Sequence, residues 1–174
     1  MALLTSPILR RVTTFGRARE ELADLFFSIP VALELGKPHL AIRKVAKEHG
    51  TGGRLVGRVE SGQKVFHFSD LITSGKSALD WIETIRSAGG EIAHYFAVFD
   101  RGQGGRKALS ENGVELHTLL VLDEEFLSFA SAKGYLRQAH VETIRRYLED
   151  PEAWTQEFLV RRPTFLAEKN RGRL

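Results

Sequence analysis

The first third of the chain contains apolar residues at helical spacing. From Arg17 onward they lie three or four positions apart, which predicts a helix that Pro30 either ends or restarts. We expect residues 31–35 to form a second short helix, which Gly36 closes. Residues 1–16 show little periodicity, so we expect residues 1–30 to be an irregular and helical N-terminal segment.

The middle of the chain alternates between β-prone and helical patterns. The expected strands are residues 39–45, 64–69, 91–99 and 115–122, and the expected helices are residues 77–88 and 106–112. This order predicts parallel strands joined by right-handed crossovers. Ligands bind at the carboxyl ends of the strands in such sheets, and the loops 70–77 and 100–105 both lie at that edge.

Helical patterns return after the last predicted strand. We expect helices over residues 123–133 and 141–150, while Pro151 and Pro163 break the remaining sequence. The sequence therefore predicts an α/β core over residues 31–122 and a C-terminal helical extension over residues 123–174.

The composition excludes several classes of protein. The 174 residues include no Cys, 43% apolar residues and 27% charged residues, which is typical of folded globular chains and not of disordered or disulfide-rich ones. The absence of Cys removes thiolate nucleophiles, zinc knuckles and iron–sulfur clusters from consideration. The net charge of +3 is too small to indicate nucleic-acid binding. No segment has the pattern of a membrane span or a secretory signal, so we expect a cytoplasmic protein.

One turn has the chemistry of phosphate binding. The segment LITSGKS, residues 71–77, ends in Gly-Lys-Ser as a P-loop does, but Asp70 stands where a P-loop needs its first glycine. The sequence therefore does not predict a nucleoside triphosphatase. The turn still follows a strand and opens a helix, so its N–H groups and hydroxyls can bind an anion. The alternative is that Thr73, Ser74 and Ser77 only cap the helix.

Four basic residues stand within seven positions at the start of a glycine-rich stretch, residues 46–63. They are Arg43, Lys44, Lys47 and His49. A run of this kind is usually a solvated face. Beside a phosphate-binding turn, it is also typical of a cationic lid that closes over a polyanion.

The histidines give no sign of a metal site. The six histidines show neither a two-histidine helical spacing nor a carboxylate triad. We therefore predict no metal site built by the protein itself, and interpret three histidines as strand residues with satisfied ring nitrogens: His67, His94 and His117.

Three segments together resemble the orotate phosphoribosyltransferases, which have the type I phosphoribosyltransferase fold. RKVAKEHGTGG, residues 43–53, resembles the catalytic loop of that family. FSDLITSGKSALDWIETIRSAGGEI, residues 68–92, resembles its motif for 5-phosphoribosyl 1-diphosphate (PRPP), and DRGQGGRKAL, residues 100–109, resembles the segment whose arginine contacts orotate. The order and spacing of the segments also match. The resemblance implies a three-layer α/β domain with a mainly parallel central sheet and extra C-terminal helices.

The resemblance also implies roles for the matching residues. Asp70 would hydrogen-bond the ribose hydroxyls of PRPP, and Arg101 would face the base. The 5-phosphate would lie in the turn formed by Thr73, Ser74, Gly75, Lys76 and Ser77. The pyrophosphate would be held by Arg43, Lys44, Lys47 and His49, with Mg²⁺ arriving as the Mg-PRPP complex. The expected catalytic residues are Lys47, His49 and Asp70.

Two features depart from the family pattern. Ser69 precedes Asp70 where the family has two adjacent acids, and residues 1–30 are shorter than the N-terminal portion that forms a hood over the base. The resemblance implies transfer of a phosphoribosyl group from PRPP to orotate, giving orotidine 5′-monophosphate and pyrophosphate, in a homodimer with shared active sites. The alternative is a catalytically degenerate PRPP- or nucleotide-binding protein with a regulatory role. No nucleic-acid or membrane partner is expected.

Overall fold

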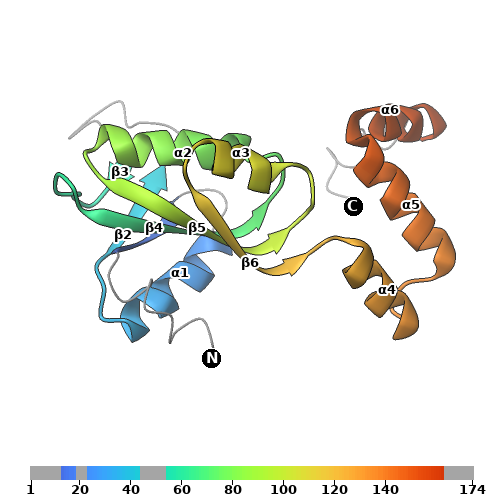
Figure 1. The fold of residues 1–174 in the computed structure, drawn as a ribbon, viewed down its shortest axis with the longest axis horizontal. Coiled ribbons are helices and arrows are strands. Elements are labelled where there is room, and N and C mark those ends of the chain that lie inside the picture. The colour runs from blue at the N-terminus through green and yellow to red at the C-terminus, as the bar shows by residue number, and fades with distance from the viewer. Residues whose placement is uncertain (1–12, 19–22, 44–53, 163–174) are drawn as a thin grey trace. The chain divides into compact units, whose positions relative to one another are not determined.

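The computed structural model describes residues 13–18, 23–43 and 54–162. Within these residues, six strands form one sheet in the order β3-β2-β1-β4-β5-β6 (Figure 1). Neighbouring strands are parallel except for the antiparallel pair of β2 and β3. The strands are β1 (Thr13–Ala18), β2 (His39–Arg43), β3 (Leu55–Val56), β4 (Lys64–Ile72), β5 (Glu91–Asp100) and β6 (Glu115–Val121).

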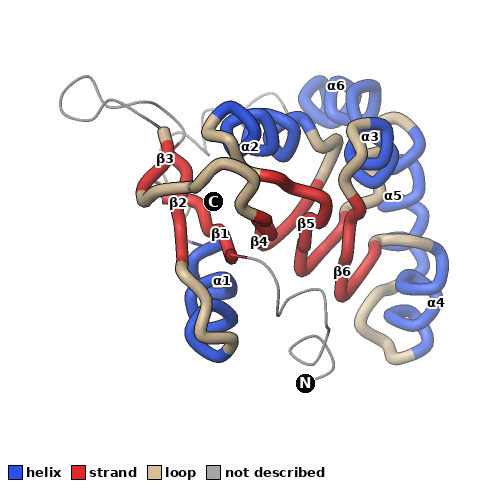
Figure 2. Tube along the Cα trace, turned by 60° about the vertical axis from the view of Figure 1, so that its left-hand side comes forward, coloured by secondary structure: helices blue, strands red, loops and turns tan. Residues whose placement is uncertain are grey.

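Helices cover both faces of this sheet, which gives three layers (Figure 2). Helix α1 (Ala23–Glu34) packs on one face, where Val31 and Leu35 contact a cluster of three buried phenylalanines from β4 and β5. Helices α2 (Lys76–Ser87) and α3 (Gly105–Glu111) cover the other face and contribute to the larger core cluster. The predicted α/β class, with its three layers and mainly parallel sheet, is confirmed.

The N-terminal segment differs from the sequence prediction. Residues 13–18 form the parallel strand β1 between β2 and β4, and α1 is one continuous helix that contains Pro30. The continuous helix has a tertiary cause: Asp24, Ser28 and Ala32 recur every four residues and are all buried. Packing of this stripe on the sheet outweighs the hydrogen bond that proline removes.

Two short elements were missed by the sequence prediction. Strand β3 lies inside the stretch expected to be a glycine-rich loop, and it pairs with β2 through Ala41 and Val56. Helix α6 (Pro151–Arg161) lies where Pro151 was expected to break the pattern. Pro151 stands in the first turn of α6, where its missing N–H costs nothing, and the Asp150 carboxylate accepts a hydrogen bond from the N–H of Ala153.

The chain separates into two compact units, Met1–Leu122 and Asp123–Leu174. The second unit contains α4 (Glu124–Ala132), α5 (Gln138–Glu149) and α6, and each helix packs on the next one. Leu127 and Val141 are buried, and the Trp154 ring lies against Tyr147 edge-on. Among the residues that the structure describes, no helix combines the length and the apolar character needed to cross a membrane.

Candidate active site

Three parallel strands end at the same edge of the sheet and bring most of the described candidate residues to it. Arg43 is the last residue of β2, Asp70 lies near the end of β4, and Arg101 follows β5. The register pairs Ile72 with Asp100, so the loops after β4 and β5 start side by side. This is the edge at which parallel α/β sheets bind ligands.

The turn between β4 and α2 has the geometry of an anion-binding site. Gly75 is the N-cap of α2 with φ of 83°, and no side chain caps the helix through a hydrogen bond. Among the described residues, no side-chain hydrogen bond uses the hydroxyls of Thr73, Ser74 or Ser77. The capping interpretation is therefore not what this structure shows, and the hydroxyls and the first N–H groups of α2 remain available to an anion.

Gly105 locks this turn to the loop after β5. Its N–H donates to the Thr73 carbonyl at 2.9 Å, and the Arg101 N–H donates to the Ile72 carbonyl at 3.0 Å. A Cβ atom at Gly105 would lie 2.6 Å from the Thr73 oxygen, so only glycine permits this approach. The backbone therefore holds Arg101 beside the turn that the sequence predicts to bind phosphate. The sequence analysis did not single out Gly105.

Asp100 shapes the loop that carries Arg101. This carboxylate is buried, and its Oδ1 accepts a hydrogen bond from the Gly102 N–H at 2.9 Å. Its Oδ2 lies 3.9 Å from Nε of Arg106 on α3. The loop is thus held from inside by a charged group that points away from the solvent.

Asp24 is a buried carboxyl that the sequence analysis did not include in the site. It belongs to α1, is 3% exposed, and its Oδ1 accepts a hydrogen bond from the Asp70 N–H at 2.6 Å. Burial raises the pKa of Asp24 to about 7, and the nearby Asp70 carboxylate contributes in the same direction, whereas the bonds from the Asp70 N–H and Ser69 oppose the rise. The only sequence signal was an acidic residue that interrupts an apolar stretch.

Ser69, which the resemblance places at the first acid of the motif, is 1% exposed. Its hydroxyl donates to the Leu71 carbonyl at 3.0 Å, within the same strand end. The second carboxyl group next to Asp70 is therefore that of Asp24, which comes from a helix 46 residues earlier in the chain.

Hydrogen bonds join Arg43 to Arg54, which lies inside the stretch predicted to form the lid, residues 46–63. The Arg43 N–H donates to the Arg54 carbonyl at 2.7 Å, and Nε of Arg54 donates to the Arg43 carbonyl at 2.9 Å. The Arg54 guanidinium also forms a two-pronged pair with Asp80 of α2, at 2.8 and 2.5 Å, and holds the pKa of Asp80 below its usual range. Three predicted lid residues lie outside the described residues: Lys44, Lys47 and His49.

Comparison with known proteins finds curated relatives that carry the name orotate phosphoribosyltransferase. No family model matches it. An orotate phosphoribosyltransferase of Halobacterium salinarum is 40% identical over 93 residues, which are 53% of this chain and 53% of that protein. That of Listeria monocytogenes is 36% identical over 121 residues, 69% of this chain and 57% of that protein. The chain therefore spans a little over half the length of these curated relatives.

A solved structure agrees with these relatives. The crystal structure of orotate phosphoribosyltransferase from Aeropyrum pernix matches with a TM-score of 0.62 and 26% identity, over 78% of this chain and 75% of that chain. The similarity in sequence and in fold confirms the resemblance that the three segments indicated. The chain therefore has the type I phosphoribosyltransferase fold and is related in sequence to the orotate phosphoribosyltransferases.

Proposed function

We propose that this protein transfers the 5-phosphoribosyl group of PRPP to orotate. The bond between C1 of the ribose and the pyrophosphate oxygen breaks, a bond from C1 to a ring nitrogen of orotate forms, and pyrophosphate leaves. The observation that carries this proposal is the cluster at the sheet edge, where the 73–77 turn, Asp70 and Arg101 lie on adjoining loops. Relatives of the chain that carry the name orotate phosphoribosyltransferase support it.

The described residues suit the ground-state part of this reaction. The turn of Thr73, Ser74, Gly75, Lys76 and Ser77 would bind the 5-phosphate through backbone N–H groups and hydroxyls. The Asp70 carboxylate would accept hydrogen bonds from the ribose hydroxyls, and the Arg101 guanidinium would pair with the negative orotate carboxylate. PRPP would bring its own Mg²⁺.

In this proposal, the basic residues of the lid stabilise the transition state. As the C1–oxygen bond breaks, negative charge grows on the pyrophosphate, so cations placed there stabilise the transition state more than the ground state. Lys44, Lys47 and His49 are the candidates, with Arg43 at the base of the lid. Closure of the lid would also exclude water, which otherwise competes with orotate and hydrolyses PRPP. No nucleophilic side chain is needed.

In this proposal, Asp24 also positions Asp70. By accepting from the Asp70 N–H, it fixes the backbone at the start of the motif. When protonated, the Asp24 carboxyl can donate a hydrogen bond to the Asp70 carboxylate and so help to position it. In this way a distant residue would compensate for Ser69.

The alternative, a degenerate PRPP- or nucleotide-binding protein, is favoured by Ser69. A protein that only binds has less need of a cationic lid, and the sequence retains all four basic residues of that lid. The relatives carry the name of the enzyme, so the comparisons do not favour the alternative.

We propose a homodimer in which the lid of one subunit closes over the site of the other. Helix α1 supports a self-association surface because Phe26, Ile29 and Leu33 lie on one side of it and are 73%, 41% and 76% exposed. A contiguous apolar face of this kind is typical of subunit contacts. The cytoplasmic location stays an expectation from the sequence.

Calorimetric titration with Mg-PRPP, followed by a panel of bases, tests the binding part of the proposal. We expect one PRPP to bind per chain and orotate to bind to the PRPP complex in preference to uracil or adenine. The control variant is Gln138→Ala, at the start of α5 in the second unit, which should bind PRPP as the wild type does. Absence of PRPP binding to the folded protein would contradict the proposal.

A further inference from the structure

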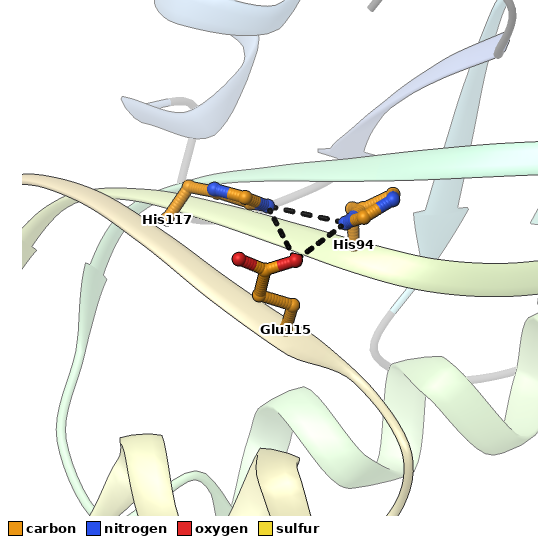
Figure 3. A group of neighbouring side chains, drawn as sticks. All are labelled: His94, Glu115 and His117. Carbon is orange, nitrogen blue, oxygen red and sulfur yellow. Dashed lines mark hydrogen bonds and ion pairs between the residues drawn. The ribbon is translucent and has the colours of Figure 1, made fainter. Parts of the chain in front are cut away.

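Three potential metal ligands converge at a place outside the candidate active site (Figure 3). His94 comes from β5, and Glu115 and His117 come from β6. His94 and Glu115 are register partners, and His117 lies two residues further along β6, so all three side chains stand on one face of the sheet. They belong to the first halves of their strands, whereas the candidate active site lies at the strand ends.

The three ligand atoms form a triangle of the size that a zinc ion requires. Nδ1 of His94 lies 3.1 Å from Nε2 of His117. Oε2 of Glu115 lies 3.4 Å from the His94 atom and 3.8 Å from the His117 atom. The circle through a triangle with these sides has a radius of about 2.0 Å, and zinc bonds to imidazole nitrogen and carboxylate oxygen measure about 2.0–2.2 Å. A single ion can therefore lie at bonding distance from all three atoms.

The surrounding sheet orients both imidazole rings. Phe66 is 2% exposed and stacks with the rings of His94 and His117, at centroid distances of 6.2 and 6.1 Å. A register shift between Val65 and Phe66 in the pairing of β4 with β5 brings His94 opposite Phe66. Strand irregularities of this kind re-aim side chains, and they are common next to functional sites. The ligand set is therefore preorganised.

The chemistry of the set selects the class of ion. Two imidazole nitrogens and one carboxylate oxygen suit borderline divalent ions such as Zn²⁺, whereas Mg²⁺ and Ca²⁺ prefer sets made of oxygen alone.

We infer that His94, Glu115 and His117 form a binding site for a zinc-like divalent ion, with a water molecule as the fourth ligand. The two histidine side chains are 26% and 27% exposed and Glu115 is 64% exposed, so solvent reaches the remaining position. The bound ion joins β6, the edge strand of the sheet, to β5 and thereby stabilises the folded core. The site does not depend on the proposed transferase activity.

Zinc titration of chelator-treated, full-length protein tests this inference. We expect calorimetry to show one Zn²⁺ per chain with a dissociation constant in the micromolar range or lower. His117→Gln should weaken binding at least about a hundredfold, because even the outer partners of a metal-bound histidine change affinity by about 10–100-fold. Glu115→Gln replaces an exposed carboxylate with a group of the same shape, so it tests the site with little risk to folding. The matched control is His140→Gln on α5, which should bind zinc as the wild type does.

A second measurement separates a metal site from a simple hydrogen-bonded histidine pair. Zinc at a hundredfold excess over its dissociation constant should raise the melting temperature of the wild type and of His140→Gln by roughly 5–10 °C. Glu115→Gln and His117→Gln should show no such rise. X-ray absorption at the zinc edge should report two imidazole nitrogens in the first shell. Equal zinc affinity in all four proteins, or binding only at millimolar zinc, would overturn the inference.

Discussion

At the scale of single residues, the buried carboxyl of Asp24 makes the stability of this protein depend on pH. Its pKa rises from 3.8 to about 7 on folding, so the folded state binds a proton that the unfolded state releases between these two values. Stability contributed by this group is therefore complete below about pH 4, falls as the pH rises, and is lost above about pH 7.

Asp24→Asn should remove this part of the pH dependence. The amide oxygen can still accept from the Asp70 N–H, but it does not titrate. As the pH rises from about 4 to about 8, the wild type should lose the stability that its protonated Asp24 provides, and the variant should not. Relative to the wild type, the free energy of unfolding of Asp24→Asn should therefore increase by roughly 2–4 kcal/mol over this range. Urea denaturation at a series of pH values measures it. The control is Glu34→Gln, which changes an exposed acid at the end of the same helix. If the free energies of unfolding of Asp24→Asn and the wild type differed by the same amount at every pH, the assigned pKa of Asp24 would be contradicted.

Asp70 and Lys47 should affect different kinetic constants. Asp70→Asn removes a charged acceptor for the ribose hydroxyls, so PRPP binding should weaken about 10–100-fold. Lys47→Ala should lower kcat about 10²–10³-fold with a small change in PRPP affinity, because the pyrophosphate charge that it meets develops in the transition state. Steady-state kinetics and calorimetry separate the two effects. If Lys47→Ala leaves kcat unchanged, the basic run is a solvated face.

At the scale of the elements, glycine contacts decide how the two loops of the site meet. Gly105→Ala would place a methyl group 2.6 Å from the Thr73 carbonyl oxygen, so the loop after β5 must move away from the phosphate-binding turn. We expect a loss of about 1–3 kcal/mol in the free energy of unfolding and a marked loss of PRPP affinity. Thermal melts and calorimetry measure both. Ser110→Ala on the same helix should change neither, and unchanged PRPP affinity in Gly105→Ala would show that the two loops act separately.

The element pattern also explains what the sequence could predict. The order from β4 to β6 follows apolar periodicity and glycine stops, so those strands and helices were predicted to within a few residues. Strand β1 was not predicted, and α1 was expected as two helices because buried packing of Asp24, Ser28 and Ala32 outweighs the local preference of Pro30. A local sequence pattern also could not indicate the group of His94, Glu115 and His117. These residues come together through the register of two strands and not through their spacing on one helix.

At the scale of the whole molecule, the sequence predicted those residues of the candidate site that lie in contiguous motifs, and it missed the others. The turn after β4 and Arg101 could be found from short segments and from the rule that ligands bind at the strand ends. Asp24 and Gly105 could not, since their roles depend on contacts with distant parts of the chain. Tertiary proximity, and not residue type, identifies them.

The proposed shared sites predict complementation between inactive subunits. Lys47→Ala and Asp70→Ala chains, mixed under conditions that exchange subunits, should regain up to about a quarter of full activity, because half of the dimers are mixed and each mixed dimer has one intact site. Native mass spectrometry verifies the exchange. Activity near zero after verified exchange would mean that each lid serves its own subunit.

The central claim is the transfer reaction, and the most direct test is product formation from purified protein, Mg-PRPP and orotate. We expect pyrophosphate to be released only when orotate is present, with one orotidine 5′-monophosphate formed for each pyrophosphate, and Lys47→Ala protein to serve as the matched control with strongly reduced turnover. Binding of PRPP without any orotidine 5′-monophosphate at high protein concentration would contradict the claim and identify a binding protein in place of an enzyme.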